Sequence, residues 1–281
     1  MIDTDIKPFL KWAGGKRQLL SHIHGRMPKK FNRYYEPFIG GGAMLFDLKP
    51  KEATINDINP ALINTYKQIC TDSNEVMKYI DVLDIAIQKT DLDKDERKKI
   101  YYEARNRFNE KIMGQEYDAE MAALLLFINK HCFNGLYRCN SKGGFNVPYN
   151  GGKSNSYDHD NLLAVADFLK VVDIHCTDFE NICNQSKEGD FVFLDSPYAP
   201  INADSFVDYT KEGFSKEDHI RLADQFKKMS TRGVYCMLTN HNTQLIHDLY
   251  VGYNTQIVQV KRLINRDSDH RVGEEVIITN Y

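Results

Sequence analysis

The sequence lacks the features that mark several special classes of protein. Its 281 residues hold no apolar run long enough to cross a bilayer, since the longest spans Ala122 to Ile128, and no N-terminal segment typical of a signal peptide. The six cysteines form no CxxC pair and have no metal-ligand spacing with nearby histidines. We therefore expect a cytoplasmic protein without membrane partners or a metal site, whose cysteines are reduced, mainly structural thiols.

An excess of positive charge is also lacking. The net charge of −3 and the pI near 6.3 do not indicate a nucleic-acid-binding domain, which is usually basic. Acidic residues are nevertheless absent between Asp5 and Glu36, and again from Met121 to Tyr157, while lysines and arginines occur in both stretches. The stretches indicate either nucleic-acid contacts or ordinary solvated faces, and charge alone leaves both interpretations open.

The residues that are present indicate a globular α/β protein. Hydrophobic residues make up 42% and charged residues 27% of the chain, which suits one large core or a core with a smaller domain. Near the N-terminus the pattern predicts, in order, a strand over Arg33–Ile39, a turn at Gly40–Gly42, a helix over Ala43–Leu48, a strand over Ala53–Asp57 and a helix from Pro60 to about Cys70, capped by Asn59. This order opens a doubly wound sheet.

A long helical segment then interrupts the strands. Helical periodicity runs from Ser73 to Cys132, with Asp118 capping a late apolar helix, and a loop rich in glycine and asparagine follows. Strand patterns return at residues 171–175, 190–194, 233–238, 254–260 and 275–279. We expect a helical insertion that divides an α/β domain.

Two motifs follow predicted strands and so lie at the carboxyl edge of the sheet. The glycines of the segment Glu36 to Gly42 would let a ligand approach the backbone closely, and Asp57 is placed to accept hydrogen bonds from ribose hydroxyls. A helix cap or turn residue is the alternative interpretation of Asp57.

The second motif is Asp195-Ser196-Pro197-Tyr198. The exocyclic amine of a base is a poor nucleophile because its lone pair is delocalised, and acceptors that hold both amino hydrogens free that lone pair. Asp195 supplies one acceptor and the carbonyl of residue 196 can supply another, while the Tyr198 ring can stack on an extruded base. A generic turn after a strand is the alternative interpretation.

Six ordered stretches carry a resemblance to a known family: Phe9-Leu-Lys-Trp-Ala-Gly-Gly-Lys16, Glu36-Pro-Phe-Ile-Gly-Gly-Gly42, Asn56-Asp-Ile-Asn59, Phe133-Asn-Gly-Leu-Tyr-Arg138, Phe145-Asn-Val-Pro148 and Asp195-Ser-Pro-Tyr198. In this order they resemble the DNA adenine methyltransferases of the Dam type. The resemblance implies a Rossmann-like methyltransferase domain of residues 1–66 and 166–281 and a mainly helical DNA-recognition domain of residues 67–165. It also implies S-adenosylmethionine as methyl donor and duplex DNA containing GATC as substrate.

The resemblance further implies roles for individual residues. Asp195, Ser196, Pro197 and Tyr198 are expected to be catalytic. The expected cofactor-binding residues are Trp12, Lys16, Phe38, Gly40, Asp57, Asp178, Phe179 and Asp195. The expected DNA-binding residues are Lys11 and Arg138 as guanine readers, Leu136 and Pro148 against a thymine methyl, Phe133 in the space left by a flipped adenine, Asn134, and Arg262, Arg266 and Arg271 as phosphate contacts or part of a solvated hairpin.

The sequence departs from the family pattern at two places. Ser196 stands where relatives usually have the first proline of Asp-Pro-Pro-Tyr, and no arginine follows Pro148 closely, where Lys153 is found instead. The carbonyl at position 196 is kept, but the fixed φ of proline is lost, so we expect an impaired enzyme. The alternatives are a non-catalytic DNA-binding relative and an amino-methyltransferase for cytosine or RNA. The sequence leaves open whether a partner restriction endonuclease acts on the same site.

Overall fold

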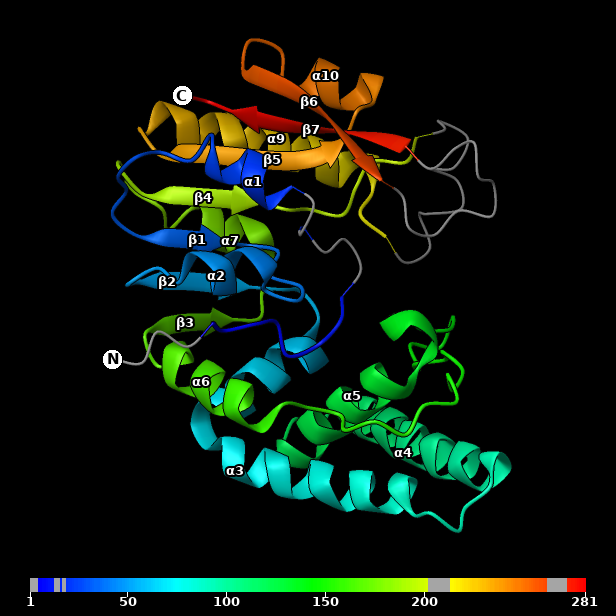
Figure 1. Cartoon of the computed structure of the whole chain (residues 1–281). Helices are drawn as coiled ribbons and strands as arrows, with labels where there is room; N and C mark the ends of the chain where they lie inside the picture. The colour runs from blue at the N-terminus through cyan, green and yellow to red at the C-terminus, as the bar shows by residue number, and fades with distance from the viewer. Residues whose placement is uncertain (1–4, 13–15, 17–18, 202–212, 262–271) are drawn as a thin grey trace. The chain divides into compact units, whose positions relative to one another are not determined.

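The computed structural model describes residues 5–12, 16, 19–201, 213–261 and 272–281 (Figure 1). The chain divides into two compact units, Met1–Gly15, Gly40–Lys49 and Asp57–Cys176 in the first, and Lys16–Ile39, Pro50–Asn56 and Thr177–Tyr281 in the second. The elements are α1 Leu20–His24, β1 Tyr34–Glu36, α2 Ala43–Leu48, β2 Ala53–Asn56, α3 Pro60–Gln88, α4 Lys94–Gly114, α5 Ala119–His131, η1 Phe133–Gly135, α6 His159–Leu169, β3 Val172–His175, α7 Phe179–Cys183, β4 Phe191–Leu194, α9 Lys216–Thr231, β5 Tyr235–His241, α10 Gln244–Leu249, β6 Asn254–Lys261 and β7 Val272–Thr279.

The strands form one seven-stranded sheet in the order β3-β2-β1-β4-β5-β7-β6. β1 pairs in parallel with β2 and β4, and β4 pairs in parallel with β5. β7 runs antiparallel to both β5 and β6. The predicted mixed α/β fold is confirmed, and α3, α4, α5 and α6 follow one another between β2 and β3.

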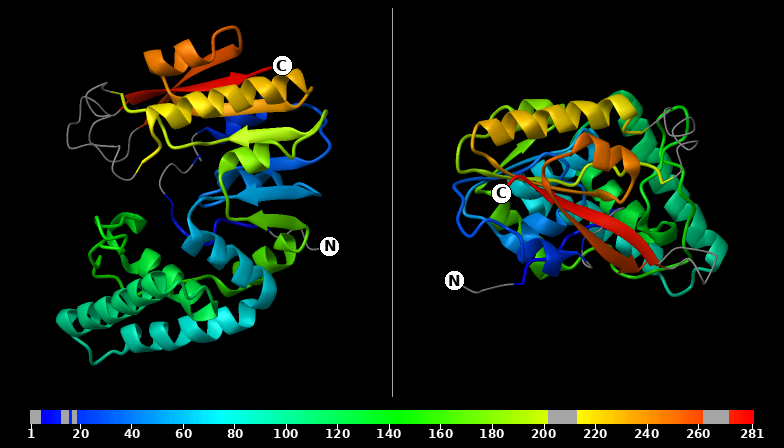
Figure 2. Two further views of the ribbon diagram at one scale, coloured as in Figure 1. Left: turned by 180° about the vertical axis from the view of Figure 1, so that it is seen from behind. Right: turned by 90° about the horizontal axis from the view of Figure 1, so that it is seen from above.

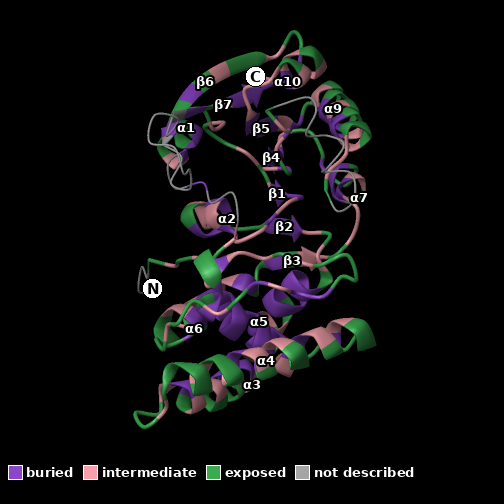
Figure 3. Ribbon diagram, turned by 90° about the vertical axis from the view of Figure 1, so that its right-hand side faces the viewer, coloured by how far each residue is buried: buried purple, intermediate pink, exposed green. Residues whose placement is uncertain are grey.

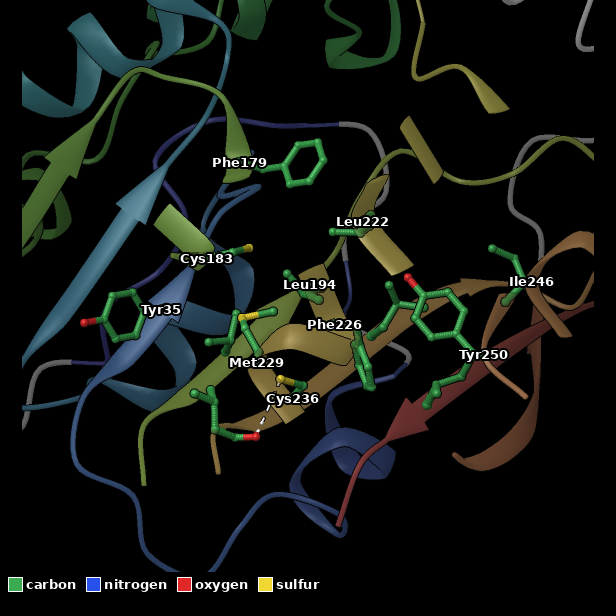
Figure 4. Packing of buried hydrophobic residues seen from close by; sticks show 14 of the residues in the cluster. Tyr35, Phe179, Cys183, Leu194, Leu222, Phe226, Met229, Cys236, Ile246 and Tyr250 are labelled. Atoms are coloured by element: carbon green, nitrogen blue, oxygen red, sulfur yellow. Dashed lines mark hydrogen bonds between the residues drawn. The ribbon is translucent and has the colours of Figure 1, made fainter. Parts of the chain in front are cut away.

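The core of the second unit lies between the sheet and α9. All four residues of β4 are buried, as expected of a parallel strand that is covered on both faces. α7 and α9 cover one face of the sheet around β4 and β5, and α1 lies on the other face (Figure 3). Leu222, Phe226 and Met229 recur at the helical period on α9 and pack against β4 and β5 (Figure 4). This packing holds β4 and β5 against α9.

In the first unit, α3 and α4 pack against α5. Residues 121–129 of α5 are all buried, and α3, α4 and α5 lie side by side (Figure 2). α5 begins as predicted, because the Asp118 carboxylate accepts the Met121 N–H at 2.9 Å. The Asn59 cap of α3 is also confirmed, since its Oδ1 accepts the N–H groups of Ala61 and Leu62.

Several element bounds differ from the prediction: β1 ends at Glu36 rather than Ile39, α3 continues to Gln88 rather than to about Cys70, and β7 begins at Val272 rather than Glu275. β5 continues to His241, three residues beyond the predicted end at Leu238, because β7 pairs with it as far as the partners His241 and Glu275.

All six cysteines are free, as predicted. No group of His, Cys, Asp and Glu in the described part of the chain could hold a metal ion. None of the helices formed by the described residues is long and apolar enough to span a bilayer.

Candidate active site

Asp195 stands directly after β4, at the carboxyl edge of the parallel strands. Its Oδ1 lies 2.8 Å from the Lys16 ammonium and accepts a hydrogen bond of 2.8 Å from the Thr239 hydroxyl on β5. The Lys16 side chain is only 6% exposed and that of Asp195 only 18%, so solvent screens this ion pair weakly. The carboxylate is thus fixed in position by two groups from different parts of the chain.

Tyr198 lies beside this carboxylate and is held at both its hydroxyl and its ring. The hydroxyl donates to Glu275 Oε2 at 2.8 Å, and the His241 ring meets the Tyr198 ring edge-on at a centroid distance of 4.8 Å. The Lys16 ammonium lies 4.5 Å from the ring centroid. Burial and the carboxylates of Asp195 and Glu275 raise the pKa of Tyr198 well above its usual value, so the hydroxyl keeps its proton.

The end of β5 supports the loop that carries the motif. Asn240 Oδ1 accepts the Ala199 N–H at 2.8 Å, and Asn240 Nδ2 donates to the Ser196 hydroxyl at 3.4 Å. The His241 ring nitrogen Nδ1 lies 2.8 Å from the Ala199 carbonyl. We call Thr239, Asn240 and His241 the buttress.

Sequence reasoning missed the buttress. The signal that could have revealed it is a run of three polar residues that directly follows an apolar strand at the same edge as Asp195.

Three phenylalanine rings gather near the start of α7. The ring centroids of Phe38 and Phe179 are 5.3 Å apart, and Phe214, which the sequence did not predict, lies 5.7 Å from Phe38 and 5.8 Å from Phe179. Asp178 caps α7 and accepts from Arg221 at 2.9 Å. The structure thus brings together three of the predicted cofactor residues, Phe38, Asp178 and Phe179.

Three more predicted cofactor residues meet in the first unit, at the glycine turn. Asp57 accepts the Gly40 N–H at 3.1 Å, and a Cβ at Gly40 would approach Trp12 Cδ1 to 2.8 Å. Gly40 and Gly42 have φ of +47° and +71°, a region that favours glycine. Burial raises the pKa of Asp57, although the N–H groups that its carboxylate accepts act in the opposite direction.

All of the predicted base-contacting residues except Lys11 lie on one irregular hairpin, residues 132–149, which we call the reading hairpin. Its two arms are joined by the isolated bridges Cys132–Tyr149 and Cys139–Phe145. Phe145 and Val147 are buried against α4 and α5, whereas the side chains expected to read DNA lie outward: Phe133, Asn134, Arg138 and Pro148 are exposed and Leu136 is half-buried.

Two features keep the reading hairpin in shape near Lys11. Asn134 adopts φ of +58°, an uncommon conformation for a residue other than glycine. A Cβ at Gly135 would approach the Lys11 side chain to 2.5 Å, so Lys11 lies directly against the turn. Arg262, Arg266 and Arg271, the predicted phosphate contacts, lie outside the described residues.

This geometry offers a fixed carboxylate and an aromatic ring at one strand end, and an exposed polar and aromatic surface on a separate hairpin. The model of the D12 class N6 adenine-specific DNA methyltransferase family matches residues 12–265. The chain belongs to this family. It is an adenine-specific DNA methyltransferase, and family members use S-adenosylmethionine as methyl donor.

Individual relatives match over nearly their whole length. The type II methyltransferase M1.LlaDCHI of Lactococcus lactis is 38% identical, over 99% of this chain and 96% of that protein. The type II methyltransferase M.MjaIII of Methanocaldococcus jannaschii is 40% identical, over 99% of this chain and 100% of that protein. A DNA adenine methylase of Vibrio cholerae is 31% identical, over 94% of this chain and 92% of that protein. The resemblance to Dam-type enzymes is confirmed.

Each unit holds residues whose chemistry suits a part of the family's cofactor. In the first unit the Asp57 carboxylate suits ribose hydroxyls, which need acceptors, and in the second the rings of Phe38 and Phe179 suit the apolar faces of an adenine. Lys16 contacts Asp195 and Tyr198 in the structure, and its predicted role in cofactor binding stays a prediction. The same is true of the other predicted roles and of the two predicted domains.

Proposed function

We propose that this methyltransferase modifies the N6 amine of the adenine in GATC, after that base has been extruded from duplex DNA. One observation carries the proposal: Asp195 is fixed at the carboxyl end of β4 by Lys16 and Thr239, with the Tyr198 ring beside it. A preorganised acceptor of this kind stabilises the positive charge that develops on an amine during transfer.

The proposed chemistry assigns one task to each residue of the motif. Asp195 accepts one amino hydrogen and the Ser196 carbonyl accepts the other, which makes the lone pair of the nitrogen available. Pro197 restricts Ser196 to extended backbone, and the Tyr198 ring stacks on the base. Bound S-adenosylmethionine would supply the methyl group: the nitrogen lone pair would form the N–C bond as the S–C bond breaks, S-adenosylhomocysteine would leave, and the amine would release one proton to solvent.

The proposed binding roles rest on the family resemblance and on where the side chains lie. Trp12, Lys16, Gly40 and Asp57, together with Phe38, Asp178 and Phe179, bind the cofactor. Lys11 and Arg138 read guanines, Leu136 and Pro148 contact a thymine methyl, and Phe133 occupies the space of the extruded base. The outward position of Arg138 and Phe133 on the reading hairpin supports these roles.

One assay tests the function. The chain is incubated with labelled S-adenosylmethionine and with matched duplexes that contain GATC or a scrambled site, and the DNA is digested to nucleosides. We expect the label on N6-methyladenine from the GATC duplex alone. Label on cytosine, or on an RNA substrate assayed in parallel, would identify the other amino-methyltransferase, and DNA binding without label would identify a non-catalytic relative.

We further propose that the methylated site is protected from a restriction endonuclease that recognises the same sequence. The names of the Lactococcus and Methanocaldococcus relatives, both type II methyltransferases, support this role. DNA treated with the enzyme and cofactor should resist a nuclease that cuts unmethylated GATC. Complete cleavage of DNA that carries N6-methyladenine would contradict the role without contradicting the methylation.

A further inference from the structure

One buried side chain of the buttress forms hydrogen bonds with two residues of the loop that follows β4 and carries the Asp195–Tyr198 motif. Asn240 is fully buried at the carboxyl end of β5 and contacts the Ser196 hydroxyl through Nδ2 and the Ala199 N–H through Oδ1. The second bond, of 2.8 Å, fixes the loop just after Tyr198. The first, of 3.4 Å, reaches the residue whose carbonyl would hold the target amine.

Ser196 is itself only 2% exposed, so water does not reach its hydroxyl. Its hydrogen bond with the Asn240 amide therefore replaces the hydrogen bonds that both groups would make to water. Within the part of the chain that the structure describes, this hydroxyl is the hydrogen-bond acceptor that Asn240 Nδ2 meets. A proline at position 196 would fix φ through its ring but would offer no hydroxyl. A proline here would restrain the backbone covalently, whereas Ser196 is restrained by the hydrogen bond of its hydroxyl to Asn240.

We propose that Asn240 is a positioning residue for methyl transfer, which acts through the Ser196 hydroxyl to aim the Ser196 carbonyl. This inference rests on the proposed function. Because the restraint acts on an acceptor that matters most in the transition state, its loss should slow the transfer step and leave the affinities for cofactor and DNA unchanged.

Single-turnover methyl transfer with saturating cofactor and GATC duplex tests the proposal. Removal of one hydrogen bond in Ser196→Ala should slow transfer by roughly three- to tenfold. Ser196→Thr keeps a hydroxyl and should transfer faster than Ser196→Ala. Asn240→Ala should be slower still, because it also loses the Ala199 contact, and adding Ser196→Ala to it should slow transfer little further.

Ser186→Ala is the matched control. Ser186 is a buried serine of the same unit, 3% exposed, and its hydroxyl donates to the Cys183 carbonyl at 2.7 Å. A comparable loss of thermal stability in Ser186→Ala and Ser196→Ala, with slower transfer only in Ser196→Ala, would separate positioning from general stability. Should Asn240→Ala fail to fold, the alanine and threonine variants at position 196 still decide the question.

The possible outcomes separate this inference from the proposed function. A parental rate in Ser196→Ala, or effects of Ser196→Ala and Asn240→Ala that multiply as for independent sites, would overturn the role of Asn240 alone. Absence of N6-methyladenine with the parent chain would overturn the proposed function itself, and the role of Asn240 with it.

Discussion

Asp195 is the residue on which the proposed chemistry depends most, because it supplies the carboxylate acceptor. The Lys16 ammonium and the Thr239 hydroxyl hold that carboxylate at the end of β4. We expect Asp195→Ala to abolish nearly all methyl transfer in single-turnover assays, since it removes the carboxylate that stabilises charge on the nitrogen. The change also leaves the buried Lys16 ammonium without this partner, which should lower stability. Asp195→Asn, which keeps the volume and a side-chain carbonyl but not the charge, separates the loss of the charge from the loss of the side chain. An alanine variant that retained most of its rate would end this account of the motif.

Ser196→Pro tests the same motif in the opposite direction. A proline ring would fix φ at the residue whose carbonyl is the second acceptor, so we expect faster transfer with nearly unchanged affinities for cofactor and DNA. Asn240 would lose a hydrogen-bond partner, which costs about 0.5–1.5 kcal/mol of stability. Single-turnover rates and thermal unfolding measure the two effects separately. A rate no higher than that of the parent would show that a fixed φ at position 196 does not outweigh the loss of the hydroxyl that Asn240 contacts.

Asp57→Ala should weaken S-adenosylmethionine binding by about 1–3 kcal/mol, measured by calorimetry, because the ribose hydroxyls lose a charged acceptor. Since burial raises the pKa of Asp57, binding should also weaken as the pH falls through that raised pKa, where the carboxyl becomes protonated. Asp57→Asn is the control, because its side-chain carbonyl can still accept the Gly40 N–H. Unchanged affinity in a folded alanine variant would remove Asp57 from the cofactor site.

At the scale of single elements, the strands and capped helices could be predicted because their causes are local. Apolar runs followed by glycine or acidic residues revealed β1, β2 and β4, and the Asn59 and Asp118 caps fixed the starts of α3 and α5. The end of β5 could not be predicted, because polar residues there are strand only through pairing with β7. The buttress was missed for the same reason.

Asn129 illustrates a contact that local patterns do not predict. It is buried on α5, accepts the Lys11 N–H at 2.9 Å, and donates to the carbonyls of Lys11 at 2.9 Å and Gly135 at 3.2 Å. It therefore fixes one proposed guanine reader against the turn of the reading hairpin.

We expect Asn129→Ala to lower stability by about 1–3 kcal/mol and to reduce the preference for GATC over single-base variants of the site. Denaturant unfolding and methylation of matched duplexes measure the two effects. Asn109→Ala is the control, because Asn109 holds the backbone of Phe145 on the far part of the hairpin. Full discrimination in a destabilised Asn129→Ala would contradict the positioning of Lys11.

At the scale of the whole molecule, the proposed reading of DNA can be separated from general attraction to its phosphates. Arg138 is exposed on the reading hairpin, and Asn146 Oδ1 accepts from its Nε at 2.7 Å, which orients the guanidinium. A bidentate contact to a guanine edge discriminates between bases, whereas a contact to phosphate does not.

We therefore expect Arg138→Ala to weaken binding to the GATC duplex by about 1–3 kcal/mol and to flatten discrimination at one base pair. Arg266→Ala, at a position proposed to contact phosphate, should instead weaken binding to all sequences alike and reduce the salt dependence of binding. Titration of matched duplexes at two salt concentrations measures both variants. Only a base contact depends on sequence. Equal losses of affinity for GATC and scrambled DNA in Arg138→Ala would therefore show that this arginine contacts the DNA backbone and that another residue recognises the guanine.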